Sequence, residues 1–157
     1  MNPQPKSPGR VAGIDYGTVR IGIALSDPMR NIASPMETYT RRNAELDAQR
    51  FKRLAEEEEV ALFVVGLPVF LDGRESPKSV EARQFGQWLA EVTGVPVDFF
   101  DERFTSAEAE NLLLDAELTK KRRKKRVDML AAQIMLSAYL ESCGRGRHDP
   151  GALDDGP

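Results

Sequence analysis

The sequence predicts a single α/β domain built on a mixed five-stranded sheet with helices on both faces. Two short apolar segments separated by a Gly-containing turn indicate an antiparallel hairpin near the N-terminus. Further along, two apolar strand-like runs each follow a segment with helical periodicity, which is typical of strands joined by helical crossovers. Three antiparallel strands followed by parallel crossovers therefore make up the expected sheet.

The hairpin is predicted from residues 11–15 and 21–26, and a third strand from residues 36–39. Asn43 is suited to cap a helix that ends in a run of glutamates, and the continuous apolar run at residues 61–67 is typical of a buried strand. Together the helix and this strand form the first crossover.

A second crossover begins at Ser76, which is followed by proline, a favourable first residue of a helix. This helix is expected to reach Gly94 and to lead into a strand at residues 95–100. Its predicted buried stripe consists of Val80, Phe85, Trp88 and Leu89.

Two more helices are predicted after this strand. Thr105 and Glu108 have the spacing of a capping box for a helix that ends near Ala116. The last helix is expected to begin near Val127 and to end at Ser142.

The composition indicates one folded domain without a membrane segment. The 157 residues suffice for one core, expected at residues 11–142, with disordered ends at residues 1–10 and 143–157. No apolar run approaches the roughly 20 residues that span a bilayer, and no secretory signal is recognisable, so we expect a cytoplasmic protein. Because Cys143 and His148 are the only cysteine and histidine, any functional metal must be bound by oxygen.

The net charge of −3 argues against a nucleic-acid partner, but the charge is unevenly distributed. Seven consecutive cations can attract phosphate even on an acidic protein. A solvated basic loop or a localisation patch is the alternative interpretation. The seven are Lys120, Lys121, Arg122, Arg123, Lys124, Lys125 and Arg126.

Carboxylates follow two of the predicted strands. Asp15 ends the first strand, where it either caps the hairpin turn or lies at a site that compensates its charge. Asp101 and Glu102 follow a later strand, and only one of them can face a given side because side chains alternate along a strand. This pair could also simply begin the next helix.

Asp128 is predicted to point into the protein, because Gln133, Ser137 and Glu141 lie on the opposite side of its helix at about 100° per residue. An inward carboxylate needs a partner, which is either an arginine, namely Arg20 or Arg103, or a metal ion. The favourable field at a helix N-terminus offers a third explanation.

Three carboxylates that converge from two strands and a helix would form a site for one or two Mg²⁺ or Mn²⁺ ions. Two such ions can activate water and stabilise the leaving oxygen when a phosphodiester is hydrolysed. The basic run ends two residues before Asp128, so phosphate-attracting charge would lie at the mouth of this site.

Four segments resemble the YqgF/RuvX family, which is described both as Holliday-junction resolvases and as nucleases that mature the 5′ end of pre-16S rRNA. They cover nearly all of the predicted domain and occur in the family's order. The segments are GIDYGTVRIGIALSD at 13–27, VVGLPVFLDG at 64–73, DERFTSAEAE at 101–110 and KKRRKKRVDMLAAQIMLSAYL at 120–140.

The resemblance implies an RNase H-like fold and a metal-dependent nuclease. It assigns catalysis and metal binding to Asp15, Glu102 and Asp128, which selects Glu102 over Asp101. Arg20 and Arg103 match basic motif positions that are expected to contact phosphate. The chain departs from the family at Val19 and Phe70, where Lys and Asn are common, so the family's substrate contacts do not carry over to these two positions.

The expected activity is hydrolysis of structured RNA during ribosome maturation. Resolution of branched DNA is the alternative within the same chemistry, because one two-metal site can hydrolyse either backbone. A resolvase would act as a symmetric homodimer, for which exposed Phe70 or Trp88 would be candidate contacts. A non-catalytic nucleic-acid-binding module is the second alternative.

Overall fold

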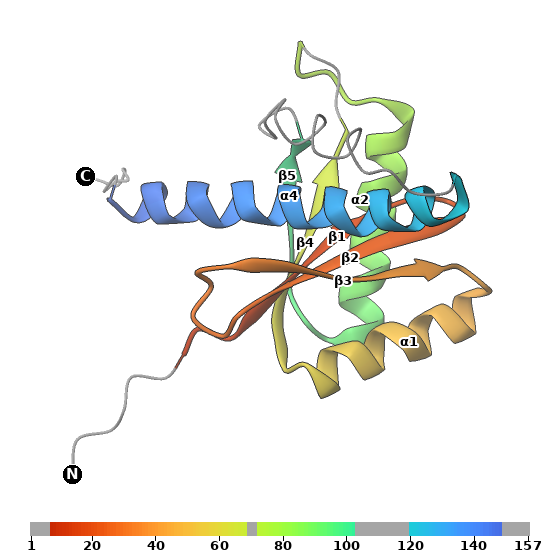
Figure 1. Ribbon diagram of the computed structural model, residues 1–157, viewed down its shortest axis with the longest axis horizontal. Coiled ribbons are helices and arrows are strands. Elements are labelled where there is room, and N and C mark those ends of the chain that lie inside the picture. The colour runs from red at the N-terminus through yellow and green to blue at the C-terminus, as the bar shows by residue number, and fades with distance from the viewer. Residues whose placement is uncertain (1–6, 69–71, 103–119, 149–157) are drawn as a thin grey trace.

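The computed structural model describes residues 7–68, 72–102 and 120–148 and places their strands in one five-stranded sheet (Figure 1). The strand order is β3-β2-β1-β4-β5. The strands are β1 (Arg10–Asp15), β2 (Arg20–Ser26), β3 (Ala33–Thr40), β4 (Val60–Leu67) and β5 (Val97–Asp101).

The sheet is mixed, as the sequence predicts. β1 pairs with β2 and β2 with β3 in antiparallel orientation, whereas β4 pairs in parallel with β1 and β5. The parallel strands β1, β4 and β5 end at one edge of the sheet. Side chains that follow these strands are therefore brought close together, which positions the candidate site described below.

Both crossover helices begin and end where the sequence predicts. α1 (Ala44–Glu57) is capped by Asn43, whose side chain accepts from the backbone N–H of Leu46. α2 (Pro77–Thr93) begins with reciprocal hydrogen bonds between Ser76 and Ser79, and it ends at a left-handed Gly94. These caps satisfy backbone groups that helix ends leave unpaired.

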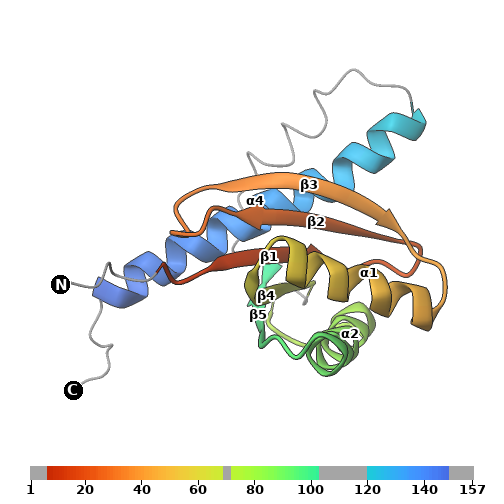
Figure 2. The same cartoon turned by 90° about the horizontal axis from the view of Figure 1, so that it is seen from below.

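The helices cover opposite faces of the sheet (Figure 2). α1 and α2 pack on one face and form a core that includes Ile14, Phe51 and Leu89. On the other face, α4 (Lys120–His148) packs through Leu136 on Val11 and Val64 of the sheet. Alternation along each strand decides which face a residue serves.

The last helix differs from its prediction at both ends. It begins at Lys120 rather than near Val127 and continues to His148 rather than ending at Ser142. The basic run therefore forms the first turns of α4 and is not a loop. Lys and Arg have high helix propensity, which explains why a run of cations extends the helix. The domain boundary predicted at 142 falls inside α4.

Two further differences concern exposure and range. Val80 is 44% exposed, so its place in the predicted buried stripe of α2 is wrong, whereas Phe85 and Leu89 are buried and Trp88 is half-buried. The predicted helix at 105–116 lies outside the described residues, as do Arg103 and Phe70. Among the described helices, none is both long and apolar enough to cross a membrane.

Candidate active site

Asp15 lies at the end of β1 on the face that α4 covers. Val11 belongs to the core under α4, and a Cβ at Gly13 would press against Leu136 of α4. By alternation Asp15 shares this face with Val11 and Gly13. The strand therefore directs the half-buried carboxylate toward α4 rather than into the hairpin turn.

Glu102 follows β5 directly and lies on the same face. Two preceding β5 residues contact Tyr139 of α4: Phe100 packs edge-on against its ring, and Asp98 accepts a hydrogen bond of 2.8 Å from its hydroxyl. Glu102 continues this alternate series, whereas Asp101 does not. The neighbouring strand leaves room, because a Cβ at Gly66 would overlap the Glu102 carboxylate.

Asp128 reaches the site from α4, more than two turns inside the helix. Its position excludes the helix N-terminus as the reason for this carboxylate. A Cβ at Gly22 would collide with the Asp128 carbonyl oxygen, so this glycine lets α4 lie directly on β2. The Asp128 side chain is 22% exposed, in agreement with the predicted inward orientation. Of the three residues predicted on the far side, Ser137 and Glu141 are exposed, whereas Gln133 is half-buried and donates to the carbonyl oxygen of Ala33.

An arginine is the observed partner of Asp128. Nε of Arg20, the first residue of β2, donates to Oδ2 of Asp128 at 2.7 Å. The sequence leaves an arginine or a metal ion open as the partner of Asp128, and in the structure this partner is Arg20. Arg103, the other arginine considered, lies outside the described residues.

The two strand carboxylates interact directly. Asp15 and Glu102 share a side-chain hydrogen bond, and burial together with the charges of Glu102 and Asp128 raises the pKa of Asp15 to about 7. Burial also raises the pKa of Glu102, despite its hydrogen bond with Asp15. Burial and a neighbouring carboxylate both disfavour the charged form of a carboxyl group, which is why the pKa values rise.

One cavity of about 410 Å³ contains all three carboxylates and Arg20. Lys78 and Glu81, from the first turns of α2, also line it, and neither was singled out in the sequence. The Lys78 charge lowers the pKa of both Asp15 and Glu102. A cation in the first turn of a helix opposes the helix dipole, and this was the signal available in the sequence.

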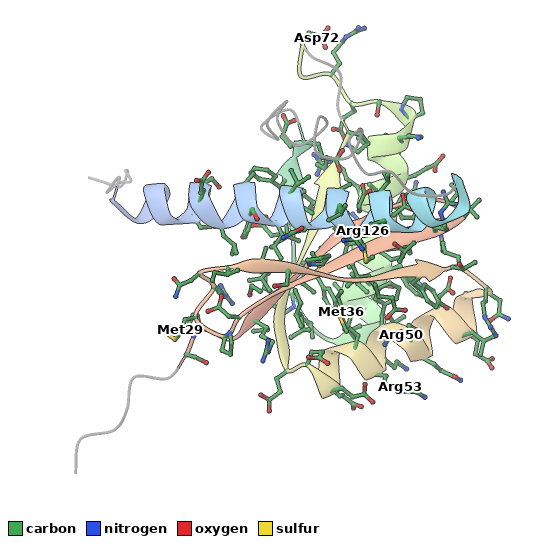
Figure 3. The ribbon with its side chains drawn as sticks, viewed as in Figure 1. Met29, Met36, Arg50, Arg53, Asp72 and Arg126 are labelled. Atoms are coloured by element: carbon green, nitrogen blue, oxygen red, sulfur yellow. The ribbon has the colours of Figure 1, made fainter. Side chains whose placement is uncertain are left out.

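The three carboxylates of the cavity are not grouped closely enough to bind one metal ion together. Within the described residues, no three His, Cys, Asp or Glu side chains are grouped closely enough to hold a metal. Asp15 and Glu102 meet, while Asp128 is held aside by Arg20. Of the basic run, the side chains of residues 120–125 lie outside the described part, and Arg126 is exposed on α4 (Figure 3).

The sheet order, the helices on both faces and the carboxylates on one face define an RNase H-like protein. Solved structures agree on this fold. The yeast mitochondrial Holliday junction resolvase Ydc2 aligns with a TM-score of 0.54 and 12% identity, covering 92% of this chain and 83% of Ydc2. RuvC of Thermus thermophilus, solved with a Holliday junction substrate, aligns with a TM-score of 0.51 and 16% identity, covering 85% and 96%.

Residues 9–142 match the family described as "RuvX: Holliday junction resolvase", and the chain belongs to this family. Curated relatives carry the name "Putative pre-16S rRNA nuclease". The relative from Rhodopirellula baltica is 50% identical over 135 residues, which cover 86% of this chain and 78% of the relative. The relative from Koribacter versatilis is 40% identical over 142 residues, which cover 90% and 93%. The resemblance inferred from the sequence motifs is confirmed.

Proposed function

We propose that this protein is a metal-dependent endonuclease that processes the 5′ end of pre-16S rRNA in the cytoplasm. Asp15, Glu102 and Asp128 hold one or two Mg²⁺ or Mn²⁺ ions and are the catalytic residues. One observation carries the proposal: carboxylates from β1, from the end of β5 and from α4 reach the same cavity. The nuclease name of the relatives supports the choice of RNA.

The donor set fits a hard divalent ion. The three residues supply carboxylate oxygens, the ligands that Mg²⁺ and Mn²⁺ prefer. Asp15 and Glu102 already crowd each other, and burial penalises their charge, so a cation between them would relieve both costs. Asp128 completes the set when its carboxylate turns from Arg20 toward the other two.

The bound ions would supply water activation and stabilisation of the leaving oxygen. The remaining work falls to residues of the chain. Arg20, once free of Asp128, remains in the cavity and binds a phosphate of the substrate strand. Lys78, from α2, provides a second positive charge in the same cavity. Arg103 is assigned the same role as Arg20 from its motif position alone.

The basic run of α4 binds substrate outside the cavity. The basic run begins at the N-terminus of α4. Cations in the first turn of a helix oppose its dipole, each at a cost of roughly 0.3–1 kcal/mol, and the effect falls off beyond that turn. A run that weakens its own helix is explained by a gain elsewhere, and phosphate is the partner that its charge fits. The proposed contacts are Lys120, Lys121, Arg122, Arg123, Lys124, Lys125 and Arg126.

Resolution of Holliday junctions is the second candidate function. The description of the family favours it, and the T. thermophilus RuvC of similar fold was solved with a junction. In that case the chain acts as a homodimer on branched DNA. A third candidate, a module that binds nucleic acid without cleaving it, retains the fold as a scaffold.

The test presents a pre-16S rRNA 5′ leader and a four-way DNA junction side by side to wild type and to Asp128→Asn, with Mg²⁺, Mn²⁺ or chelator. We expect metal-dependent cleavage of the RNA, absent from the variant. Cleavage of the junction alone would select the resolvase. Tight binding of either substrate without cleavage would select the non-catalytic module.

A further inference from the structure

Two more cavities continue from the candidate active site along the α1 side of the molecule. We call the first the aromatic pocket; it measures about 390 Å³ and shares Tyr16, Thr18 and Glu81 with the active-site cavity. The second, of about 280 Å³, is called the arginine groove and shares Arg42 with the aromatic pocket. The three cavities therefore adjoin one another in sequence along this side of the molecule.

The wall of the aromatic pocket is a cluster of packed aromatic rings with an arginine lying over two of them. Tyr16 and Phe85 have centroids 5.0 Å apart, and Phe85 and Trp88 have centroids 5.4 Å apart, with tilted rings in both pairs. The Arg41 guanidinium lies over Tyr16 at 5.5 Å and over Phe85 at 5.6 Å. Aromatic rings and stacked guanidinium planes are the surfaces on which proteins stack unpaired bases.

A buried carboxylate binds Arg41, which lies over this wall. Asp47 of α1 is 1% exposed and accepts from the Tyr39 hydroxyl at 2.6 Å and from Arg41 Nε at 3.2 Å. Arg41 also donates to the Tyr16 hydroxyl at 3.2 Å. Arg41 thus joins the β1–β2 turn to α1, so a ligand would find the stacking surface already formed.

The arginine groove carries a concentration of positive charge. Arg42, Arg50 and Arg53 line it together with Tyr39, Leu46 and Gln49. Arg50 is paired with Glu37, whereas Arg42 and Arg53 are exposed. Figure 3 shows Arg50 and Arg53 projecting from α1. Arginine side chains grouped along a groove fit the phosphates of a polynucleotide.

We propose that an unpaired segment of the substrate strand runs from the active-site cavity through the aromatic pocket into the arginine groove. One base stacks against the wall formed by Tyr16, Trp88 and Arg41, and the following phosphates bind Arg42 and Arg53. A duplex cannot use this pocket, because its base faces are covered by neighbouring bases. The inference rests on the proposed nuclease function and defines its substrate as single-stranded at this position.

Trp88 allows the pocket to be tested directly, because it is the only tryptophan of the chain and lines the pocket. Its fluorescence is measured in chelator, which prevents cleavage, while a short oligoribonucleotide is added. A deoxyribonucleotide of the same sequence, its duplex and polyglutamate form parallel titrations. We expect the single strands to quench the Trp88 fluorescence saturably and the duplex to change it little. The single strand that binds more tightly identifies the substrate as RNA or DNA. Equal quenching by the duplex, quenching by polyglutamate or no quenching at all would overturn the proposal.

The groove is tested with Arg42→Glu and Arg53→Glu, and Lys52→Glu serves as control. Lys52 is the exposed neighbour of Arg53 on α1, does not line the groove, and undergoes the same change of charge. Each arginine variant should weaken single-strand binding about tenfold and lower the salt slope by about 0.7, the value for one lost single-strand phosphate contact. If Lys52→Glu weakened binding as much as the arginine variants do, only net charge would matter, and the proposed role of the groove would be overturned. All three side chains are exposed, so thermal unfolding should match wild type.

Cleavage assays separate this inference from the proposed function. Metal-dependent cleavage in which Arg53→Glu raises KM several-fold and leaves kcat unchanged supports both. Cleavage with an unchanged KM in both arginine variants contradicts the strand path and leaves the nuclease intact. Quenching of Trp88 by single strands without cleavage by wild type supports the path and contradicts the nuclease.

Discussion

Arg20 donates a 2.7 Å hydrogen bond to Asp128 across 108 residues of sequence and so joins β2 to α4 inside the candidate active site. The pair is partly exposed, at 31% and 22% of the two side chains. In the proposed function a divalent ion needs the same carboxylate, so we propose that Arg20 and the ion compete for Asp128. Release of Arg20 would then make its positive charge available to a substrate phosphate.

Replacement of Arg20 separates its two proposed roles. Arg20→Met should tighten Mn²⁺ binding about three- to tenfold, because the ion no longer displaces a guanidinium, and should slow cleavage, because a phosphate contact is lost. Calorimetric titration of Mn²⁺ and cleavage rates measure the two effects. Arg83→Met, which breaks an exposed ion pair with Glu75, is the control. Unchanged Mn²⁺ affinity in Arg20→Met would refute the competition.

The raised pKa of Asp15 predicts that its ionisation lowers the free energy of unfolding as the pH rises to neutral and above. Its folded value of about 7 exceeds the unfolded value of 3.8, so its contribution to stability is fully present below pH 3.8 and is lost as the pH rises through 7. Asp15→Asn does not ionise and should be more stable than metal-free wild type at pH 8, by up to about 4 kcal/mol for a shift of this size. Denaturant unfolding at pH 4 and pH 8 measures the difference. Equal stabilities at pH 8 would contradict the assignment.

Replacement of Gly66 by alanine should affect cleavage, whereas replacement of Gly22 by alanine should affect stability. In Gly66→Ala the new Cβ displaces the Glu102 carboxylate, a side chain that can move, so cleavage should fall at least tenfold while thermal stability changes little. In Gly22→Ala the Cβ meets the Asp128 backbone of α4, so the protein should lose stability, by about 1–3 kcal/mol as in other overpacked interiors. Parallel melting curves and cleavage rates distinguish them. A stability loss confined to Gly66→Ala would contradict this account.

The basic run should lower the stability of α4 and strengthen the binding of nucleic acid. Replacement of four of its cations by glutamine relieves their repulsion by the helix dipole and should raise stability by up to about 1 kcal/mol. The same change should weaken nucleic-acid binding and flatten its salt dependence, since each phosphate contact contributes about 0.9 to the slope on duplex. Anisotropy titrations across a salt series measure the slope, and an unchanged slope would exclude the run from the interface. The substitutions are Lys121→Gln, Arg122→Gln, Lys124→Gln and Lys125→Gln.

Hydrophobic periodicity was sufficient to predict the sheet, because buried strands and capped helices carry local signals. Asn43, Ser76 and Gly94 each act at the helix end where the sequence placed them. The predicted start of α4 near Val127 is wrong because the first turns of the helix contain only cations. Cations favour helix but show no apolar periodicity. Val80 satisfied the helical period of α2 and is nevertheless exposed, because period alone does not define the width of the buried stripe.

The placing of the three carboxylates in one cavity could be predicted where it depends on strand alternation and on motifs. The sequence required that only one of Asp101 and Glu102 face the site, and the contacts of Asp98 and Phe100 with Tyr139 place Glu102 on the α4 face. The choice of Arg20 as partner of Asp128 depends on how α4 crosses β2, and no local pattern encodes that crossing. Lys78 belongs to the cavity for the same reason, since the packing of α2 brings it there.

The most direct test of the three-carboxylate site is the rate of metal-dependent cleavage by Asp15→Asn, Glu102→Gln and Asp128→Asn on the substrate that wild type cleaves. Asp101→Asn is the matched control, because this carboxylate adjoins Glu102 in sequence and lies outside the cavity lining. The account predicts that each of the three variants loses at least a hundredfold in rate while Asp101→Asn stays within a fewfold of wild type. Full activity in any of the three, with Mg²⁺ or Mn²⁺ still required, would contradict the site.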